Sequence, residues 1–198
     1  MDFNKNYILE NEKVLLRPLE ESNFEHLINF SLNEPELWNY SLIPANGEEN
    51  LRNYIKLAIE NREEGKEYPF IVFDKIKQKY AGSTRFYDIQ TSQLTLQLGY
   101  TWYGKEFQGT GLNKSCKFLL LEFAFENLAF ERVEFRADNR NERSIRAMKS
   151  IGCIEEGILR NNGFDQFKNR RDSIVLSILK KEWFETVKEN LAIKIKNL

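Results

Sequence analysis

The feature that most constrains this chain is a short glycine loop set between a strand-like segment and a long apolar helix. Apolar residues alternate from Leu94 to Trp102, and an apolar helical pattern runs from Leu112 to about Leu128. The loop 107–111 between them reads FQGTG. Two glycines two positions apart let successive backbone N–H groups turn into one concavity, and the helix start adds unpaired donors and a positive dipole end. The segment therefore predicts a site for an anionic group such as a phosphate.

Two familiar glycine motifs do not fit this loop. A dinucleotide-binding fingerprint needs a third glycine where this chain has Lys114. A Walker loop needs glycine directly before its Lys-Ser pair, where this chain has Asn113. The loop therefore predicts an anion site of another kind.

Length and composition indicate one soluble domain over residues 1–198. The chain has 41% hydrophobic residues, which is enough for a full core. Its 29 basic and 30 acidic side chains give a net charge of -1, so nothing in the bulk charge favours nucleic acid or an anionic membrane. Cys116 and Cys153 form neither a disulfide framework nor a metal or redox motif. No apolar signal core or run of about 20 apolar residues is present, so we expect a cytoplasmic protein.

Hydrophobic periodicity predicts a mixed α/β order. Strands are expected at 13–19, 68–73, 80–89, 94–102, 132–137, 153–160 and 173–179, and helices near 24–28, 46–65, 112–128, 141–151 and 182–196. The three middle strands read as an antiparallel meander, and the pattern then changes to alternating strands and helices. We therefore expect one α/β (α+β mixed) domain with a mixed, mostly antiparallel sheet and helices on both faces.

The motif order resembles the GNAT superfamily of acetyl-CoA-dependent N-acetyltransferases. The family's pyrophosphate loop reads Gln/Arg-x-x-Gly-x-Gly/Ala, and this chain has Gln108, Gly111 and, as a departure, the bulkier Asn113. The segments 138–144, 151–153, 155–160 and 171–173 follow in an order similar to that of the RimJ/RimL-like branch, which acetylates protein N-termini and small amines. The resemblance covers most of the chain and is strongest from Leu94 to Trp183.

This resemblance implies a sheet that is splayed where the pantetheine arm of acetyl-CoA pairs with backbone groups. Gly99 in the strand 94–102 supports a bulge or a close backbone approach there. No metal is implied. The residues expected to bind acetyl-CoA are Tyr100, Thr101, Trp102, Gln108, Gly109, Thr110, Gly111, Leu112, Asn113, Lys114, Asn139, Asn141 and Ser144.

The resemblance also implies two catalytic residues. In many relatives a tyrosine four residues before the glycine that ends the helix acts as general acid, but this chain has Met148 there. Ser144 is therefore expected to assist departure of the thiolate, although a Ser three residues after an Asn is also ordinary helix-capping sequence. Glu156 is expected to act as the base, directly or through water, with a pKa raised by a partly apolar cleft. An ordinary surface glutamate remains the alternative.

The acceptor and the class of protein remain open at the level of sequence. Trp38, Tyr40 and Phe164 are candidates to wall a slot for a peptide N-terminus, a polyamine or another small amine, or else they pack their loops. The leading hypothesis is an N-acetyltransferase, monomeric or homodimeric, in which a primary amine attacks acetyl-CoA directly in a ternary complex. A catalytically silent acyl-CoA-binding regulatory module is the alternative. A nucleotide-binding or RNA-binding protein is disfavoured by net charge and by the failed Walker pattern.

Overall fold

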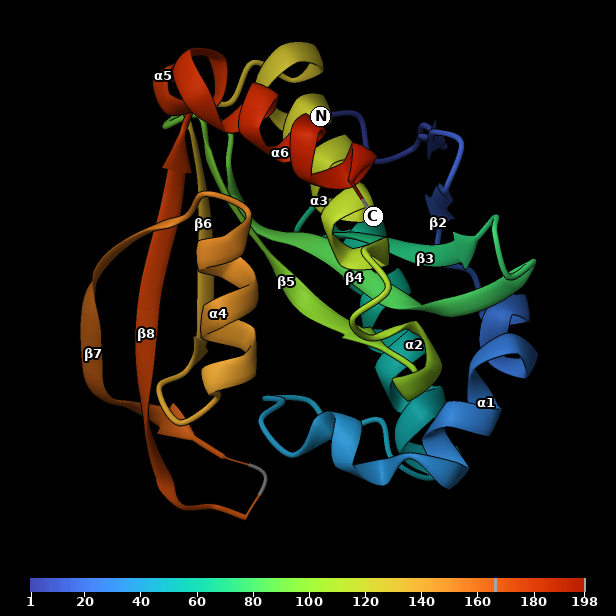
Figure 1. Ribbon diagram of the computed structural model, residues 1–198. Helices are drawn as coiled ribbons and strands as arrows, with labels where there is room; N and C mark the ends of the chain where they lie inside the picture. Colours follow the sequence, from blue (N-terminus) through green and yellow to red (C-terminus); the bar gives the residue numbers. More distant parts are fainter. Residues whose placement is uncertain (166, 198) are drawn as a thin grey trace.

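The computed structural model describes residues 1–165 and 167–197, and its centre is one eight-stranded sheet (Figure 1). The strands are β1 (Leu9–Glu10), β2 (Val14–Pro18), β3 (Tyr68–Asp74), β4 (Lys79–Gln90), β5 (Thr95–Tyr103), β6 (Arg132–Asp138), β7 (Ile154–Phe164) and β8 (Arg170–Leu179). Their order in the sheet is β1-β2-β3-β4-β5-β6-β8-β7. The pair β5 and β6 is parallel, and the other neighbours are antiparallel. The expected mixed, mostly antiparallel sheet is thus confirmed.

Helices cover both faces of this sheet. They are α1 (Phe24–Asn33), α2 (Glu48–Glu63), α3 (Leu112–Glu122), α4 (Glu142–Ser150), α5 (Lys180–Glu182) and α6 (Lys188–Lys196). Short 3₁₀ turns span Glu21–Asn23, Pro35–Trp38 and Lys105–Phe107, and π-helical turns span Phe123–Asn127 and Trp183–Val187. In Figure 1, α3 and α4 lie in front of the sheet and α2 crosses behind it. The two π turns continue α3 and link α5 to α6, so the expected helices 112–128 and 182–196 are present with wider turns inside them.

The core follows the sequence pattern closely in α3. Leu112, Cys116, Leu120 and Leu121 are all buried, so this helix is apolar on more than one face. A helix of this kind has to be enclosed between the sheet and other elements. It packs against β2 on one side and α6 on another. The enclosure fixes the start of α3, and with it the glycine loop, against the middle of the sheet.

The sheet opens in its middle, between β5 and β6. These strands pair at only three positions, from Thr95 with Arg132 to Gln97 with Glu134. Beyond that point β6 pairs only with β8, and β5 pairs only with β4. The facing edges of β5 and β6 therefore carry backbone groups without a partner strand. This divergence, called the fork below, is the expected splay.

A β-bulge marks the β5 side of the fork. Ser83 of β4 is opposite Trp102 and Arg85 is opposite Gly99, so Thr84 alone faces both Tyr100 and Thr101. Tyr100 has φ +47°, a left-handed conformation that is uncommon for a residue with a side chain. The bulge that Gly99 predicts thus lies at the next two residues. Gly99 itself allows the close approach of β4, because a Cβ there would lie 2.9 Å from the Tyr87 ring.

Candidate active site

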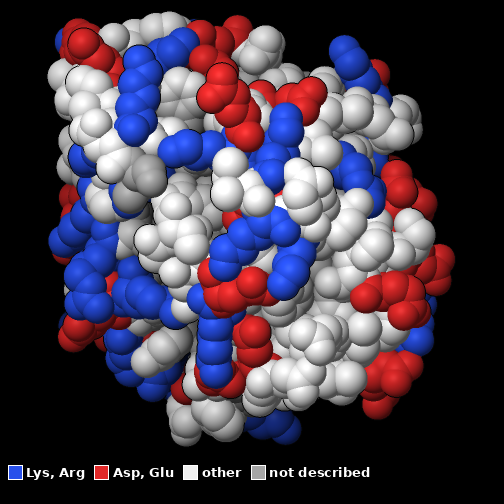
Figure 2. Space-filling view, turned by 45° about the vertical axis from the view of Figure 1, so that its right-hand side comes forward, with Lys and Arg blue, Asp and Glu red and all other residues white. Residues whose placement is uncertain are grey.

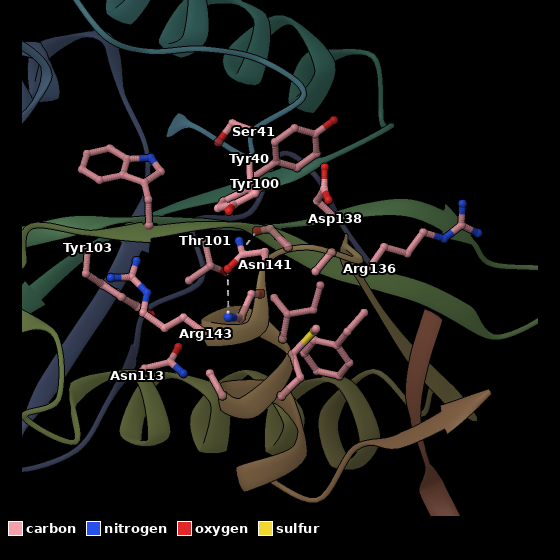
Figure 3. A pocket seen from close by; sticks show the side chains of 18 of the residues that line it. Tyr40, Ser41, Tyr100, Thr101, Tyr103, Asn113, Arg136, Asp138, Asn141 and Arg143 are labelled. Atoms are coloured by element: carbon pink, nitrogen blue, oxygen red, sulfur yellow. Dashed lines mark hydrogen bonds between the residues drawn. The ribbon is translucent and has the colours of Figure 1, made fainter. Parts of the chain in front are cut away.

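A cavity of about 490 Å³ occupies the fork. Small-molecule sites have volumes of this order. Its walls come from β5, β6, the glycine loop, α3, α4 and the segment that follows the 3₁₀ turn Pro35–Trp38. Ten of the residues expected to bind the cofactor line it: Tyr100, Thr101, Trp102, Gln108, Gly109, Gly111, Asn113, Lys114, Asn141 and Ser144. Side chains from β5, α3 and the start of α4 come together around one space in Figure 3.

The glycine loop has the conformation that its sequence indicates. Gly109 and Gly111 both have positive φ, +77° and +88°, and Gly111 is the N-cap of α3. A Cβ at Gly109 would meet no atom within 4 Å, so open space lies beside the backbone there. Neighbouring N–H groups and the positive end of α3 make this rim of the cavity suitable for an anion.

The opposite rim is the start of α4. Asn141 is the N-cap, and its side-chain oxygen accepts a hydrogen bond from the Ser144 backbone N–H at 3.1 Å (Figure 3). Asn141 therefore performs the capping, whereas no hydrogen bond within the described part of the chain involves the Ser144 hydroxyl. Because Ser144 lines the cavity, that hydroxyl is available to a bound molecule.

Gln108 connects the two rims. Its side-chain nitrogen donates to the Tyr103 carbonyl oxygen at 2.8 Å, and its side-chain oxygen accepts from the Arg143 guanidinium. Arg143 is thereby held over the cavity mouth beside the glycine loop. Gln108, the first residue of the loop motif, thus orients a cation of α4 as well as shaping the loop.

The side chains that line the cavity carry a net positive charge. Five of the described lining residues are basic, Lys114, Lys117, Arg136, Arg143 and Arg171, and one, Asp138, is acidic. Over the face seen in Figure 2, by contrast, basic and acidic side chains are interspersed. The chain's net charge of -1 is a whole-chain value, and the charges around the cavity favour an anionic molecule locally.

Three of the expected cofactor residues lie outside the lining. Thr110 is exposed, and its hydroxyl donates to the Phe107 carbonyl oxygen at 2.8 Å, which closes the loop. Leu112 is 4% exposed and packs in the core. Asn139 is exposed and donates its backbone N–H to the Asp172 carbonyl oxygen. The contacts described for these three residues are with the rest of the chain, so any contact that they make with a ligand stays a prediction.

Glu156 has surroundings opposite to those expected from the sequence. It does not line the cavity, and its carboxylate is bound by Arg132 at 2.8 Å and accepts a hydrogen bond from Ser177 at 2.6 Å. The hydrogen bond from Arg132 lowers the pKa of Glu156. The expected apolar cleft and raised pKa are wrong, because β7 is an edge strand and Glu156 points toward β8 and β6.

One end of the cavity, near Tyr40 and Asp138, holds an arginine that is 5% exposed. Arg171 of β8 donates to the Tyr40 carbonyl oxygen at 3.3 Å, and its Nε, which is 3.9 Å from an Asp138 oxygen, has no hydrogen-bond partner among the described residues. Asp138 is 1% exposed, and hydrogen bonds from the Arg140 side chain lower its pKa. This end of the cavity is therefore polar and charged.

Of the three aromatic residues expected around an acceptor slot, the structure brings only one to the cavity. Tyr40 lines it and is 42% exposed. Trp38 is fully buried against Trp102, with ring centres 5.0 Å apart, so it is a packing residue. Phe164 is 55% exposed, but it lies at the end of β7 and does not line the cavity. Residues 161–164, which lie beyond the strand expected at 153–160, continue β7, and Asn162 of this extension lines the cavity.

Sequence reasoning missed several functional candidates in this cavity. Asp138 and Arg171 belong to segments that carry the family resemblance, but their side-chain roles appear only in three dimensions. Lys117 could have been selected from the sequence, because a lysine is seldom found inside a helix that is expected to be buried on more than one face. Arg136 and Arg143 read as ordinary surface residues.

Further findings concern the described residues as a whole. No group of three or more His, Cys, Asp or Glu residues among them is arranged to hold a metal ion. Across residues 1–165 and 167–197, we find no helix with the length and apolar character that a bilayer crossing requires. Both cysteines are unpaired and buried.

Residues 13–154 match the model of the acetyltransferase (GNAT) domain family. The chain belongs to the GNAT acetyltransferase family. It is therefore an acyltransferase.

Relatives of known name agree with this membership. The chain is 25% identical over 177 residues to p20 of Bacillus licheniformis, named an uncharacterized N-acetyltransferase, covering 88% of this chain and 97% of p20. Over 87 residues it is 37% identical to YdaF of Bacillus subtilis, whose description assigns it to ribosomal N-acetyltransferases, covering 44% of this chain and 46% of YdaF. A solved structure described as an acetyltransferase from T. thermophilus is 32% identical, with a TM-score of 0.84 over 94% of this chain and 96% of that chain.

Proposed function

We propose that this GNAT protein transfers an acetyl group from acetyl-CoA to a primary amine, by direct attack in a ternary complex. The observation that carries the proposal is the combination of an opened sheet edge with a glycine-loop anion site at one end of the same cavity. Acetyl-CoA has a pyrophosphate, an extended amide chain and a thioester in that order. The cavity offers matching groups in the same order.

The pyrophosphate would lie at Gly109 and Gly111, where the start of α3 favours negative charge. Arg143 and Lys114 supply cations at that rim. The pantetheine amides would pair with the free edge of β5 around the bulge, as an added strand does. The thioester would then reach the inner part of the fork, next to Ser144. The acceptor would approach it from the part of the cavity that Tyr40 lines.

The chain's residues supply positioning and charge stabilisation. The acceptor amine attacks in its neutral form, and holding it beside the thioester makes the step effectively unimolecular. Ser144 is the proposed donor to the departing thiolate, because it lines the cavity and its hydroxyl has no hydrogen bond within the described part of the chain. We assign no base. Glu156 is engaged by Arg132, and the carboxylate of Asp138 is engaged by Arg140.

Two finer assignments also belong to this proposal. A RimJ/RimL-like acceptor, a protein N-terminus or small amine, is supported by the local similarity to YdaF and by the motif order after residue 138. A cytoplasmic location is supported by two unpaired buried cysteines.

The test is a screen of amines and of short peptides with free N-termini, with acetyl-CoA as donor and release of free thiol as readout. Acceptor-dependent thiol release, with an acetylated product of the matching mass, supports the proposal. Binding of acetyl-CoA without thiol release for any acceptor class would instead support a silent acyl-CoA-binding module, the alternative motivated by Met148 and Asn113. Absence of acetyl-CoA binding would overturn both.

A further inference from the structure

Lys117 is a buried cation whose hydrogen bonds, in the described part of the chain, go to hydroxyl groups rather than to a carboxylate. It is 5% exposed and lies on α3 among apolar side chains. Burying an ammonium without an opposite charge is costly, because the low-dielectric interior does not replace its hydration. A position of this kind, at a cavity wall, is a candidate for function.

The Lys117 ammonium lies in the fork itself. Its Nζ donates to the Thr101 hydroxyl at 2.7 Å and to the Thr84 hydroxyl at 3.2 Å. Those threonines face each other across the bulge, with hydroxyl oxygens 2.7 Å apart. On the other side of the fork, the Phe135 ring centre of β6 is 6.0 Å from the same Nζ. The charge is therefore placed between the two diverging strands.

The ammonium also has donor capacity left. It carries three N–H groups, and two of them are used by the threonines. Lys117 lines the cavity. A bound molecule with an oxygen atom in the fork would find a charged donor whose other two bonds already hold it in place.

The position along α3 matches the thioester rather than the phosphates. Lys117 is five residues after Leu112, which places it about 7.5 Å farther along the helix axis than the anion site at the helix start. It contacts Thr101 of the bulge, which lies on the open edge of β5. A chain that enters at the glycine loop and follows β5 inward therefore brings its inner end to Lys117.

On the basis of the acetyl transfer proposed above, we propose that the Lys117 ammonium binds the carbonyl oxygen of the acyl thioester and stabilises the oxyanion formed on attack. The acceptor nitrogen forms the C–N bond, and the carbonyl electron pair moves to the oxygen beside Lys117. The pair then returns, the C–S bond breaks, and the thiolate takes a proton from the Ser144 hydroxyl, which regains one from the acceptor nitrogen. Lys117 stays protonated throughout, so it serves as a charged donor.

The pH range of this role follows from the surroundings of the ammonium. Burial lowers the pKa of Lys117 to about 8. The titratable groups that interact with it are the thiols Cys116 on α3 and Cys153 after α4, and burial raises the pKa of both, so they are neutral in this range. Thr84, Thr101 and Phe135, from β4, β5 and β6, carry no charge. The contact should therefore be present at pH 7 and lost as the pH rises through about 8.

The deciding experiment uses the full chain with acetyl-CoA labelled with ¹³C at the thioester carbonyl, followed by isotope-edited infrared spectroscopy. Bound to the wild type at pH 7, the carbonyl band should shift to lower wavenumber than in free acetyl-CoA, because a cation polarises the bond. The shift should disappear in Lys117→Met, persist in Lys117→Arg, and fade in the wild type as the pH rises past about 8. Lys181→Met is the matched control, since Lys181 is exposed on α5 and should leave the shift unchanged.

A kinetic measurement separates contact with the carbonyl from support of the bulge. With an acceptor found in the thiol-release screen, Lys117→Met should lower turnover at pH 7 by about a hundredfold to a thousandfold with acetyl-CoA affinity retained, as expected for losing one oxyanion donor. The wild-type to Lys117→Met ratio of turnover should fall toward one as the pH rises, and in this ratio the ionisation of the acceptor cancels.

Several outcomes would overturn the role of Lys117. An unshifted carbonyl band in wild type that binds acetyl-CoA, or unchanged turnover in Lys117→Met, excludes contact with the thioester. Loss of acetyl-CoA affinity in both Lys117→Met and Thr101→Val, with the carbonyl band unshifted in wild type, makes Lys117 a support for the bulge. Failure of the wild type to bind acetyl-CoA at all would instead be a failure of the proposed function.

Discussion

Similar sequence reasoning assigns chemistry to Ser144 and to Glu156, yet the surroundings of the two side chains differ. Ser144 lines the cavity, and Asn141 rather than Ser144 caps α4. The Glu156 carboxylate lies away from the cavity, between Arg132 and Ser177. At the scale of residues, the chemical role of a side chain therefore depends on the groups that surround it in the folded protein.

Ser144→Ala should therefore separate chemistry from capping. We expect turnover to fall by about tenfold to a thousandfold, in line with losing a positioned donor. The free energy of unfolding should change by less than about 0.5 kcal/mol, because no described contact of the hydroxyl is lost. Asn141→Ala is the comparison for stability, since removing a true cap costs about 1 kcal/mol. Thiol release and thermal unfolding measure the two effects. Unchanged turnover in Ser144→Ala would remove it from the catalytic residues.

Glu156→Gln should change how the free energy of unfolding depends on pH and leave turnover unchanged. The pKa of Glu156 is lowered in the folded protein, so the ion pair stabilises at neutral pH and its contribution is lost as pH falls through the folded-state pKa. We expect a small loss of stability at pH 7, below about 1 kcal/mol because the side chain is 40% exposed, that vanishes in acid. Melting temperatures from pH 3 to 7 measure this effect. A large loss of turnover would restore Glu156 as the base.

At the scale of elements, two helices of this protein begin at a glycine with positive φ. Gly111 starts α3 with φ +88°, and Gly47 starts α2 with φ +85°. Both glycines adopt a positive-φ conformation that residues with a Cβ rarely adopt, because of steric clashes. Of the two, only Gly111 lines the cavity. The pair therefore provides an internal control for the anion site.

Gly111→Val should abolish stabilisation by acetyl-CoA, because a branched side chain would fill the space beside the loop and strain its backbone. Gly47→Val should lower the melting temperature through the same backbone strain but leave the increment produced by acetyl-CoA intact. Thermal unfolding of both variants with and without acetyl-CoA gives the comparison. If Gly111→Val is stabilised as strongly as the wild type, the glycine loop does not hold the pyrophosphate.

At the scale of the whole molecule, the fork divides the sheet into two parts. The strands β1 to β5 form one part and β6, β8 and β7 the other, joined by three residue pairs between β5 and β6. A ligand that pairs with the open edge would connect the parts, and it would bind only the folded chain.

Acetyl-CoA at about a hundred times its dissociation constant should raise the free energy of unfolding by about 2.7 kcal/mol. For a chain of this size that corresponds to roughly 2–4 °C in melting temperature for each kcal/mol. Thermal unfolding against acetyl-CoA concentration measures the effect, and adenosine serves as control because it lacks both the pyrophosphate and the pantetheine arm. Equal stabilisation by adenosine would contradict binding along the fork.

Most strands and helices and the glycine loop could be predicted from local sequence patterns, whereas the short strand β1 and the 3₁₀ turn Pro35–Trp38 were not predicted. Alternating apolar residues specify a strand, and glycines at 109 and 111 specify a positive-φ turn before α3, because both patterns depend on local geometry. The order of motifs was enough to indicate the GNAT family. Ten of the residues expected to bind the cofactor line the cavity, because the short segments that carry them, at the loop, the bulge and the start of α4, follow one another closely in sequence.

Contacts between side chains from distant segments could not be predicted from the sequence, because they depend on how the elements pack together. The side on which Glu156 lies depends on the edge position of β7 and its register with β8. The contact of Lys117 with Thr84 and Thr101 joins residues up to 33 positions apart through a bulge whose register no local pattern specifies. Burial and charge pairing are set by non-local packing, so the electrostatics of the fork emerge only when the strands and α3 are assembled.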